Sequence, residues 1–134
     1  MPRFLSFVCL LALFGCGDTK REVDCISPDG ERIAAFYTES GGGAAGYAYE
    51  YVSVRPSTSE FSGGGKAFMM SHGYDTRLTW TGRRSLEIGY PDSATVMDSP
   101  STLEDVRITI VPLPSRDGVL NDTLKGCMRQ KSTR

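Results

Sequence analysis

Ser71, His72 and Asp75 place a hydroxyl, an imidazole and a carboxylate close together in the sequence, and His72 is the only histidine. Such groups can act as nucleophile, general base and orienting acid in acyl transfer. Neighbouring residues of a strand point to opposite faces, however, and no G-x-S-x-G sequence surrounds Ser71. We therefore interpret His72 as a surface or turn residue, and predict no catalytic residues and no enzymatic activity.

Two glycine-rich segments have the composition of phosphate-binding loops. Gly41, Gly43 and Gly46 match the spacing of a dinucleotide fingerprint, which needs a helix N-terminus directly after it to hold the pyrophosphate. A tyrosine-rich segment of strand character follows instead, and residues 63–66 lack the Ser or Thr of a P-loop. One histidine and no free thiolate also supply few ligands for a transition metal. We predict two ordinary loops, no cofactor and no metal site.

The charges nearly balance, with 15 Lys and Arg against 16 Asp and Glu among 134 residues. Sites for nucleic acid need clustered basic side chains. The composition therefore argues against a nucleic-acid partner.

The N-terminus has the layout of a secretory signal peptide. Arg3 precedes an uncharged apolar run over residues 4–14. A helix of that length rises only ~16 Å, roughly half the thickness of a hydrocarbon core. A permanent membrane span is therefore the weaker interpretation, and we expect residues 1–15 to be removed as a signal peptide.

The sequence Leu13-Phe14-Gly15-Cys16 ends this run and resembles the lipobox of bacterial lipoproteins. The resemblance implies cleavage before Cys16, acylation of Cys16, and a mature protein anchored to a membrane of the cell envelope. Multiple acyl chains make such attachment stable. Gly17 rather than an aspartate follows Cys16, which favours the periplasmic face of the outer membrane. The alternative is an ordinary secretory signal with a chance cysteine.

The remaining cysteines predict one disulfide. Cys9 would leave with the signal peptide and Cys16 would carry lipid, so Cys25 and Cys127 remain in an oxidising compartment. Closing a loop of about 100 residues is worth ~4–5 kcal/mol in the loop-entropy model. A reactive or metal-binding thiol pair is the alternative, although neither cysteine belongs to a C-x-x-C motif.

The chain beyond the signal peptide predicts a mostly β protein. Glycine, at 15 of 134 residues, favours turns and short strands over helical bundles. We expect a polar lipidated tether over residues 16–24 and a single domain over residues 25–134, built as a small antiparallel β-meander. The predicted strands begin near Arg32 and then cover residues 47–54, 66–70, 75–80, 85–90 and 106–111, the third and fourth of these ranges forming a hairpin.

The C-terminal part departs from this pattern. Val119, Leu120, Leu124 and Cys127 recur at helical intervals, which predicts a short C-terminal helix over one face of the sheet. Residues 92–103 are rich in Ser, Pro and Asp and are expected to form a mobile loop.

A longer combination of segments also has a family resemblance. Cys25-x-Ser27-Pro28-Asp29-Gly30, followed by Leu78-Thr79-Trp80 and by residues 86–90, is similar to a small uncharacterised domain of bacterial envelope lipoproteins. The resemblance covers about residues 25–90, and it implies no activity.

The aromatic residues are the ones that could recognise a partner: Tyr37, Tyr47, Tyr49 and Tyr51, together with Tyr74 and Trp80. Exposed aromatic rings can stack on sugars or anchor a partner protein. Alternatively, the rings form core beneath the C-terminal helix. We favour the core for Trp80 and at least one tyrosine, because so small a sheet needs large side chains to bury enough area.

The sequence therefore predicts a lipid-anchored binding or scaffold module for an envelope protein or for cell-wall glycan. The alternative is a periplasmic inhibitor or immunity protein that blocks a toxin or a hydrolase. An inhibitor would need a protruding loop, and residues 40–46 and 92–103 are the candidates.

Overall fold

The computed structural model describes residues 17–121 and residue 127, and its described part is mostly β, as predicted. The strands are β1 (Asp18–Ile26), β2 (Arg32–Gly41), β3 (Tyr47–Pro56), β4 (Lys66–Ser71), β5 (Arg77–Gly82), β6 (Ser85–Pro91), β7 (Thr95–Asp98), β8 (Thr102–Leu103), β9 (Val106–Leu113), β10 (Ser115–Arg116) and β11 (Val119–Leu120). A short 3₁₀ helix, η1 (Gly43–Ala45), joins β2 to β3.

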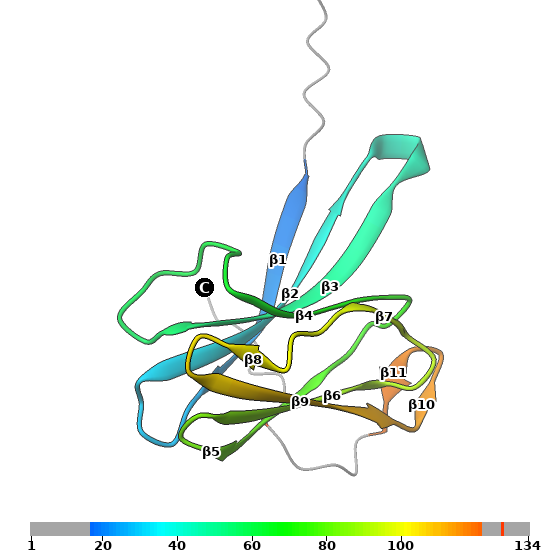
Figure 1. Cartoon of the computed structure of the whole chain (residues 1–134). Coiled ribbons are helices and arrows are strands. Elements are labelled where there is room, and N and C mark those ends of the chain that lie inside the picture. Colours follow the sequence, from blue (N-terminus) through cyan, green and yellow to red (C-terminus); the bar gives the residue numbers. More distant parts are fainter. Residues whose placement is uncertain (1–16, 122–126, 128–134) are drawn as a thin grey trace, which may run out of the picture.

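Two sheets enclose the core (Figure 1). The first has the strand order β1-β2-β3-β4-β7 and the second the order β5-β6-β9-β8, while β10 and β11 form a separate hairpin. Inward side chains alternate along each strand with outward ones. The core is formed by buried apolar residues that include Ala34, Phe36, Val52, Val54, Phe68, Leu78, Leu86, Ile88 and Ile108.

The residues expected to form a tether make up most of β1. This strand pairs antiparallel with β2, beginning with Asp18 opposite Ser40. Val23 and Cys25 enter the core, whereas most other β1 side chains stay partly or fully exposed. An edge strand buries few side chains and is protected from further pairing by charge, so the polarity of this segment does not indicate a tether.

Residues 92–103, expected to form a mobile loop, contain two short strands. β7 pairs with β4 at one edge of the first sheet, and β8 pairs with β9 at one edge of the second. β6 and β9 pair in parallel, because the chain leaves the second sheet after β6, adds β7 to the first sheet and then returns. The two sheets are otherwise antiparallel, so this crossover is the departure from a simple meander.

The prediction of a helix beginning at Val119 is wrong for the described residues. β10 and β11 form a hairpin there, and Asp117 and Gly118 make its turn with φ angles of 52° and 76°. Asp-Gly is a favoured pair for two-residue turns that need two left-handed positions. That local preference outweighs the helical spacing of Val119 and Leu120, and Leu124 lies outside the described residues.

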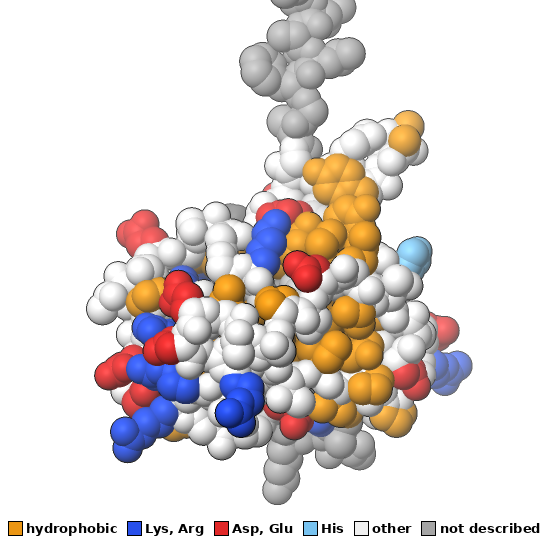
Figure 2. Space-filling view, in the orientation of Figure 1, with side chains coloured by type: hydrophobic (Ala, Val, Ile, Leu, Met, Phe, Trp, Pro, Cys, Tyr) orange, Lys and Arg blue, Asp and Glu red, His pale blue; other side chains and the backbone are white. Residues whose placement is uncertain are grey.

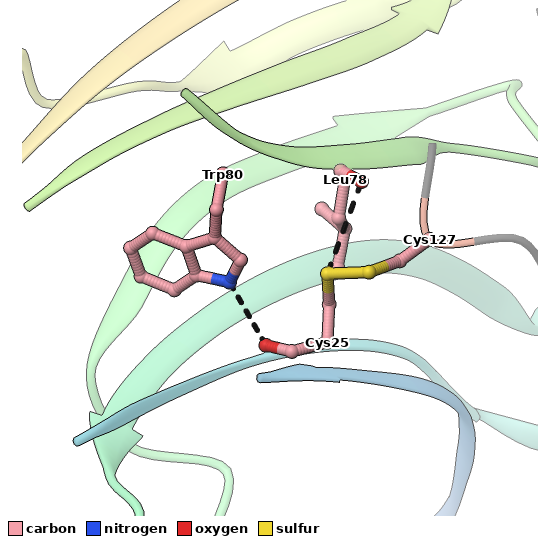
Figure 3. Close-up of a disulfide and its surroundings, with 4 residues drawn as sticks. All are labelled: Cys25, Leu78, Trp80 and Cys127. Atoms are coloured by element: carbon pink, nitrogen blue, oxygen red, sulfur yellow. Dashed lines mark hydrogen bonds between the residues drawn. A yellow bond between two sulfur atoms is a disulfide. The ribbon is translucent and has the colours of Figure 1, made fainter. Parts of the chain in front are cut away.

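A disulfide between Cys25 and Cys127 links the edges of the two sheets (Figure 3). Their Cα atoms lie 5.7 Å apart across a sequence separation of 102 residues. Cys127 also donates its backbone N–H to the carbonyl oxygen of Leu78 on β5 over 2.8 Å. The indole Nε1 of Trp80 donates to the carbonyl oxygen of Cys25 over 3.0 Å. These bonds connect β1 to β5 along one side of the two-sheet sandwich.

Candidate binding surface

The four tyrosines predicted as a binding surface divide into a covered pair and an exposed pair, of which Tyr47 is exposed and Tyr49 partly so. Tyr37 and Tyr51 are buried on the outer face of the first sheet, with their rings stacked 5.2 Å apart. Burial raises the pKa of both phenols. Trp80 is partly buried against the core, as expected, whereas the two buried tyrosines are covered on the other face of the sheet and lie outside the core cluster.

The cover over this pair is the β3–β4 loop, residues 57–65, rather than the expected C-terminal helix. The ring of Phe61 meets Tyr37 edge-on, with their centroids 5.0 Å apart. The hydroxyl of Tyr37 donates to the carbonyl oxygen of Gly63 over 3.0 Å, and the backbone N–H of Val54 donates to Gly65 over 2.9 Å. Residues 63–65 therefore fold the loop back onto the sheet, which gives this glycine run a structural role.

The exposed pair lies on the β2–β3 hairpin, which projects from the body of the molecule (Figure 1). The rings of Tyr47 and Tyr49 stack with centroids 5.6 Å apart, and 48% of Tyr47 remains exposed. Tyr47 opposes Gly41 and Tyr49 opposes Glu39 in the strand register. This end of the aromatic row is therefore the part of the predicted surface that a partner can reach.

Glycine is required at the hairpin tip by backbone conformation and by close contact. Gly42 has a φ of 88°, in the left-handed region that favours glycine. A Cβ atom on Gly41 would lie 2.9 Å from the hydroxyl oxygen of Tyr47. A Cβ atom on Gly46 would lie 3.0 Å from the carbonyl oxygen of Gly43. The G-x-G-x-x-G spacing thus serves a compact turn against the ring of Tyr47.

A second exposed apolar pair occurs at the β10–β11 hairpin. Tyr74 is 70% exposed, and its backbone N–H donates to the carbonyl oxygen of Gly118 over 3.0 Å. The Tyr74 ring lies so close to Gly118 that a Cβ atom there would be 3.0 Å from it. Val119, the next residue, is 49% exposed. Sequence spacing alone does not place Tyr74 against this turn.

A buried carboxylate that was not among the predicted site residues, Glu50, lies on the inner face of β3. Glu50 is almost fully buried, and its Oε2 has no hydrogen-bond partner. Burial, together with the nearby carboxylate of Glu22, raises the pKa of Glu50 to about 7. Glu50 is the acidic residue in a row of alternate, inward-facing positions that otherwise holds Ala48, Val52 and Val54. The sequence alone therefore shows an acidic residue at a position expected to be apolar.

Arg84 holds together three turns at one end of the sandwich. Its guanidinium contacts Asp29, Glu31 and Asp105, at 2.7 Å for Asp29 and for Asp105. Arg32 adds a second cation, 3.0 Å from Asp105. Hydrogen bonds from Ser27 and from the backbone of residue 31 lower the pKa of Asp29 to about 2, with a further contribution from Arg84. Each of these carboxylates is ion-paired with a guanidinium of the same cluster, so the cluster is structural in character.

Ser71 and His72 do meet, contrary to the expectation that they point to opposite faces. The Ser71 Oγ and His72 Nδ1 atoms lie 3.1 Å apart at the surface. His72 has a φ of 61°, a left-handed position that breaks the strand alternation. The Asp75 carboxylate accepts the backbone N–H of Thr76 over 2.9 Å.

Within residues 17–121 and 127, no three His, Cys, Asp or Glu side chains are grouped so that they could hold a metal ion. The same residues include no helix with the length and apolar character to cross a membrane. The predicted lipidation site, Cys16, lies immediately outside the described residues. Comparisons with protein-family models, with curated proteins and with solved structures find no match for this chain.

Proposed function

We propose that this protein is a lipid-anchored, non-enzymatic module of the bacterial cell envelope that binds an envelope protein. The sequence Leu13-Phe14-Gly15-Cys16 supports an anchor at Cys16, and Gly17, in place of an aspartate, supports the periplasmic face of the outer membrane. A disulfide between Cys25 and Cys127 suits an exported protein, because disulfides persist in oxidising compartments.

The observation that carries the binding role is the exposed ring of Tyr74, which lies against Gly118 in the turn that precedes exposed Val119. Interface hot spots favour tyrosine, because it offers a large rigid ring together with a polar hydroxyl. The backbone bond between Tyr74 and Gly118 holds the Tyr74 backbone against the β10–β11 hairpin, so little backbone freedom is lost when a partner binds. A protein surface with a small apolar pocket is the complement that we expect.

The test is photo-crosslinking in cells, with p-benzoylphenylalanine at position 74 or, as a matched control, at exposed Thr81. We expect one discrete protein adduct from position 74 and none from position 81. Tyr74→Ser should also abolish co-purification of that protein. Equal crosslinking from both positions, or retention on peptidoglycan alone, would contradict the proposal, and the latter result would favour cell-wall glycan.

The second candidate function is inhibition of a toxin or hydrolase, and the projecting β2–β3 hairpin favours it (Figure 1). A projecting loop can enter an active-site cleft. An inhibitor should remain fully active in a soluble Cys16→Ala form and lose activity in a Tyr47→Ser variant. An anchored binding module should behave in the opposite way. Partner binding in cells should be lost in the soluble Cys16→Ala form and should be unchanged in Tyr47→Ser.

A further inference from the structure

The register of the first sheet places the start of β1 beside the tip of the β2–β3 hairpin. Asp18 lies opposite Ser40, and Ser40 in turn lies opposite Ala48. Gly17 is also close to this turn, because a Cβ atom added to Gly17 would lie 3.7 Å from the carbonyl oxygen of Ser40. Figure 1 shows β1 and the hairpin rising side by side from the body of the molecule.

This arrangement leaves almost no spacer between the anchor and the fold. Under the proposed function Cys16 carries the acyl chains, and only Gly17 separates it from β1. A strand advances about 3.3 Å per residue, so two residues place Cys16 at most ~7 Å beyond Asp18. The bilayer surface must then lie close to the level that the hairpin tip, residues 41–47, reaches.

The chemistry of the tip suits a lipid headgroup layer. Residues 41–47 are Gly, Ala and Tyr, without a single charge. Ala44, Ala45 and Tyr47 are exposed there, and Figure 2 shows hydrophobic side chains at the end of the hairpin and farther down it, whereas the charged side chains of that face lie below the tip. Tyrosine concentrates at membrane interfaces, because its ring is apolar and its hydroxyl remains hydrated.

We propose that the tip of the β2–β3 hairpin, residues 41–47, rests in the phospholipid headgroup layer beside the acylated Cys16. This inference rests on the proposed function, because it needs the anchor. The hairpin and the lipid then form two neighbouring contacts with the bilayer, which fix the orientation of the rigid sandwich. The β10–β11 hairpin, whose Gly118 is hydrogen-bonded to Tyr74, lies well below the tip in Figure 1 and stays available to a periplasmic partner.

The test uses the full-length lipidated protein in vesicles of phosphatidylethanolamine and phosphatidylglycerol that carry brominated acyl chains. Two variants, Tyr47→Trp and Tyr74→Trp, are compared with the parent protein, whose Trp80 provides a common background. We expect the added emission of Tyr47→Trp to be quenched and shifted to shorter wavelength. The added emission of Tyr74→Trp should be neither quenched nor shifted.

Vesicle flotation separates failure of this inference from failure of the proposed function. If the parent protein does not float, the anchor is absent and the proposed function fails. If the protein floats while Tyr47→Trp is unquenched, or is quenched no more than Tyr74→Trp, the membrane contact of the hairpin is refuted. Thermal unfolding of both variants checks that each remains folded.

Discussion

Trp80 and Cys25 are joined across the sandwich by a 3.0 Å hydrogen bond from the indole nitrogen to a backbone carbonyl (Figure 3). Cys25 is also bonded to Cys127, whose backbone pairs with Leu78. The edge strands β1 and β5 are therefore held by a covalent bond and by two hydrogen bonds within one small region. These bonds attach β1, a polar edge strand, to the rest of the domain.

Removal of the disulfide should destabilise the protein strongly. The double variant Cys25→Ala/Cys127→Ala releases a loop of about 100 residues, for which the loop-entropy model gives an upper estimate of ~4–5 kcal/mol. Urea denaturation of the parent and variant measures the loss. Added reductant should lower the urea midpoint of the parent and leave that of the variant unchanged. The intact mass of the oxidised parent should show the loss of two hydrogens. A variant with the same urea midpoint as the oxidised parent would contradict the prediction.

Trp80→Phe tests the neighbouring hydrogen bond with the disulfide intact. The variant keeps an aromatic ring but leaves the carbonyl oxygen of Cys25 without the indole donor, which should cost about 1–3 kcal/mol of unfolding free energy. Chemical denaturation under oxidising conditions measures this cost. Tyr74→Phe, at an exposed ring, is the control and should change stability little; equal effects of the two substitutions would refute a special role for the Trp80 bond.

The sequence predicted the central strands well, because they combine alternating apolar residues with clear turn signals. β3 is the best example, since Val52 and Val54 face the core while Tyr51 faces away from it. β1 escaped prediction because its burial is decided by β2 and by the disulfide, and not by its own hydrophobicity. Asp117-Gly118 shows the opposite case, in which a readable local turn signal was outweighed in our interpretation by helical spacing.

The candidate surface was predictable only in part. Strand alternation correctly groups Tyr47, Tyr49 and Tyr51 on one face, but it cannot show that residues 57–65 fold over Tyr37, beside Tyr51, and leave Tyr47 exposed. Similarly, no sequence spacing relates Tyr74 to Gly118, because the tertiary fold brings their two different loops together. The exposure of a side chain depends on which distant segments pack over it, and the local sequence pattern does not contain that information.

The charge cluster around Arg84 should make the protein sensitive to acid. The pKa of Asp29 is lowered to about 2, chiefly by the Ser27 and backbone hydrogen bonds, and the pKa of Asp105 is lowered chiefly by Arg32. A carboxyl with a lowered pKa stabilises the folded state above its unfolded pKa and loses that contribution as pH falls through the folded value. Stability should therefore decrease between about pH 4 and pH 2.

Asp29→Asn should remove part of this acid sensitivity, and thermal unfolding at several pH values measures it. The variant should be less stable than the parent at pH 6, and the difference should narrow as pH falls toward 2. Glu60→Gln, at an exposed loop position, is the control and should leave the acid profile unchanged. A constant difference between Asp29→Asn and the parent across this range would contradict the role assigned to the Asp29 carboxylate.

Glu50 should give the opposite pH dependence near neutrality. Its pKa is raised from the ordinary 4.5 to about 7, so the folded state holds a proton that the unfolded chain releases. Stability therefore falls as pH rises from about 4.5 to 7, with a cumulative cost of up to about 3 kcal/mol.

Glu50→Gln keeps the shape of the side chain without the charge. The variant should be more stable than the parent at pH 8 and similar to it at pH 4. Urea denaturation at both values measures the two differences, with Glu87→Gln on β6, only partly buried, as the control; parallel stability profiles of parent and Glu50→Gln would show that Glu50 ionises in the folded protein without cost.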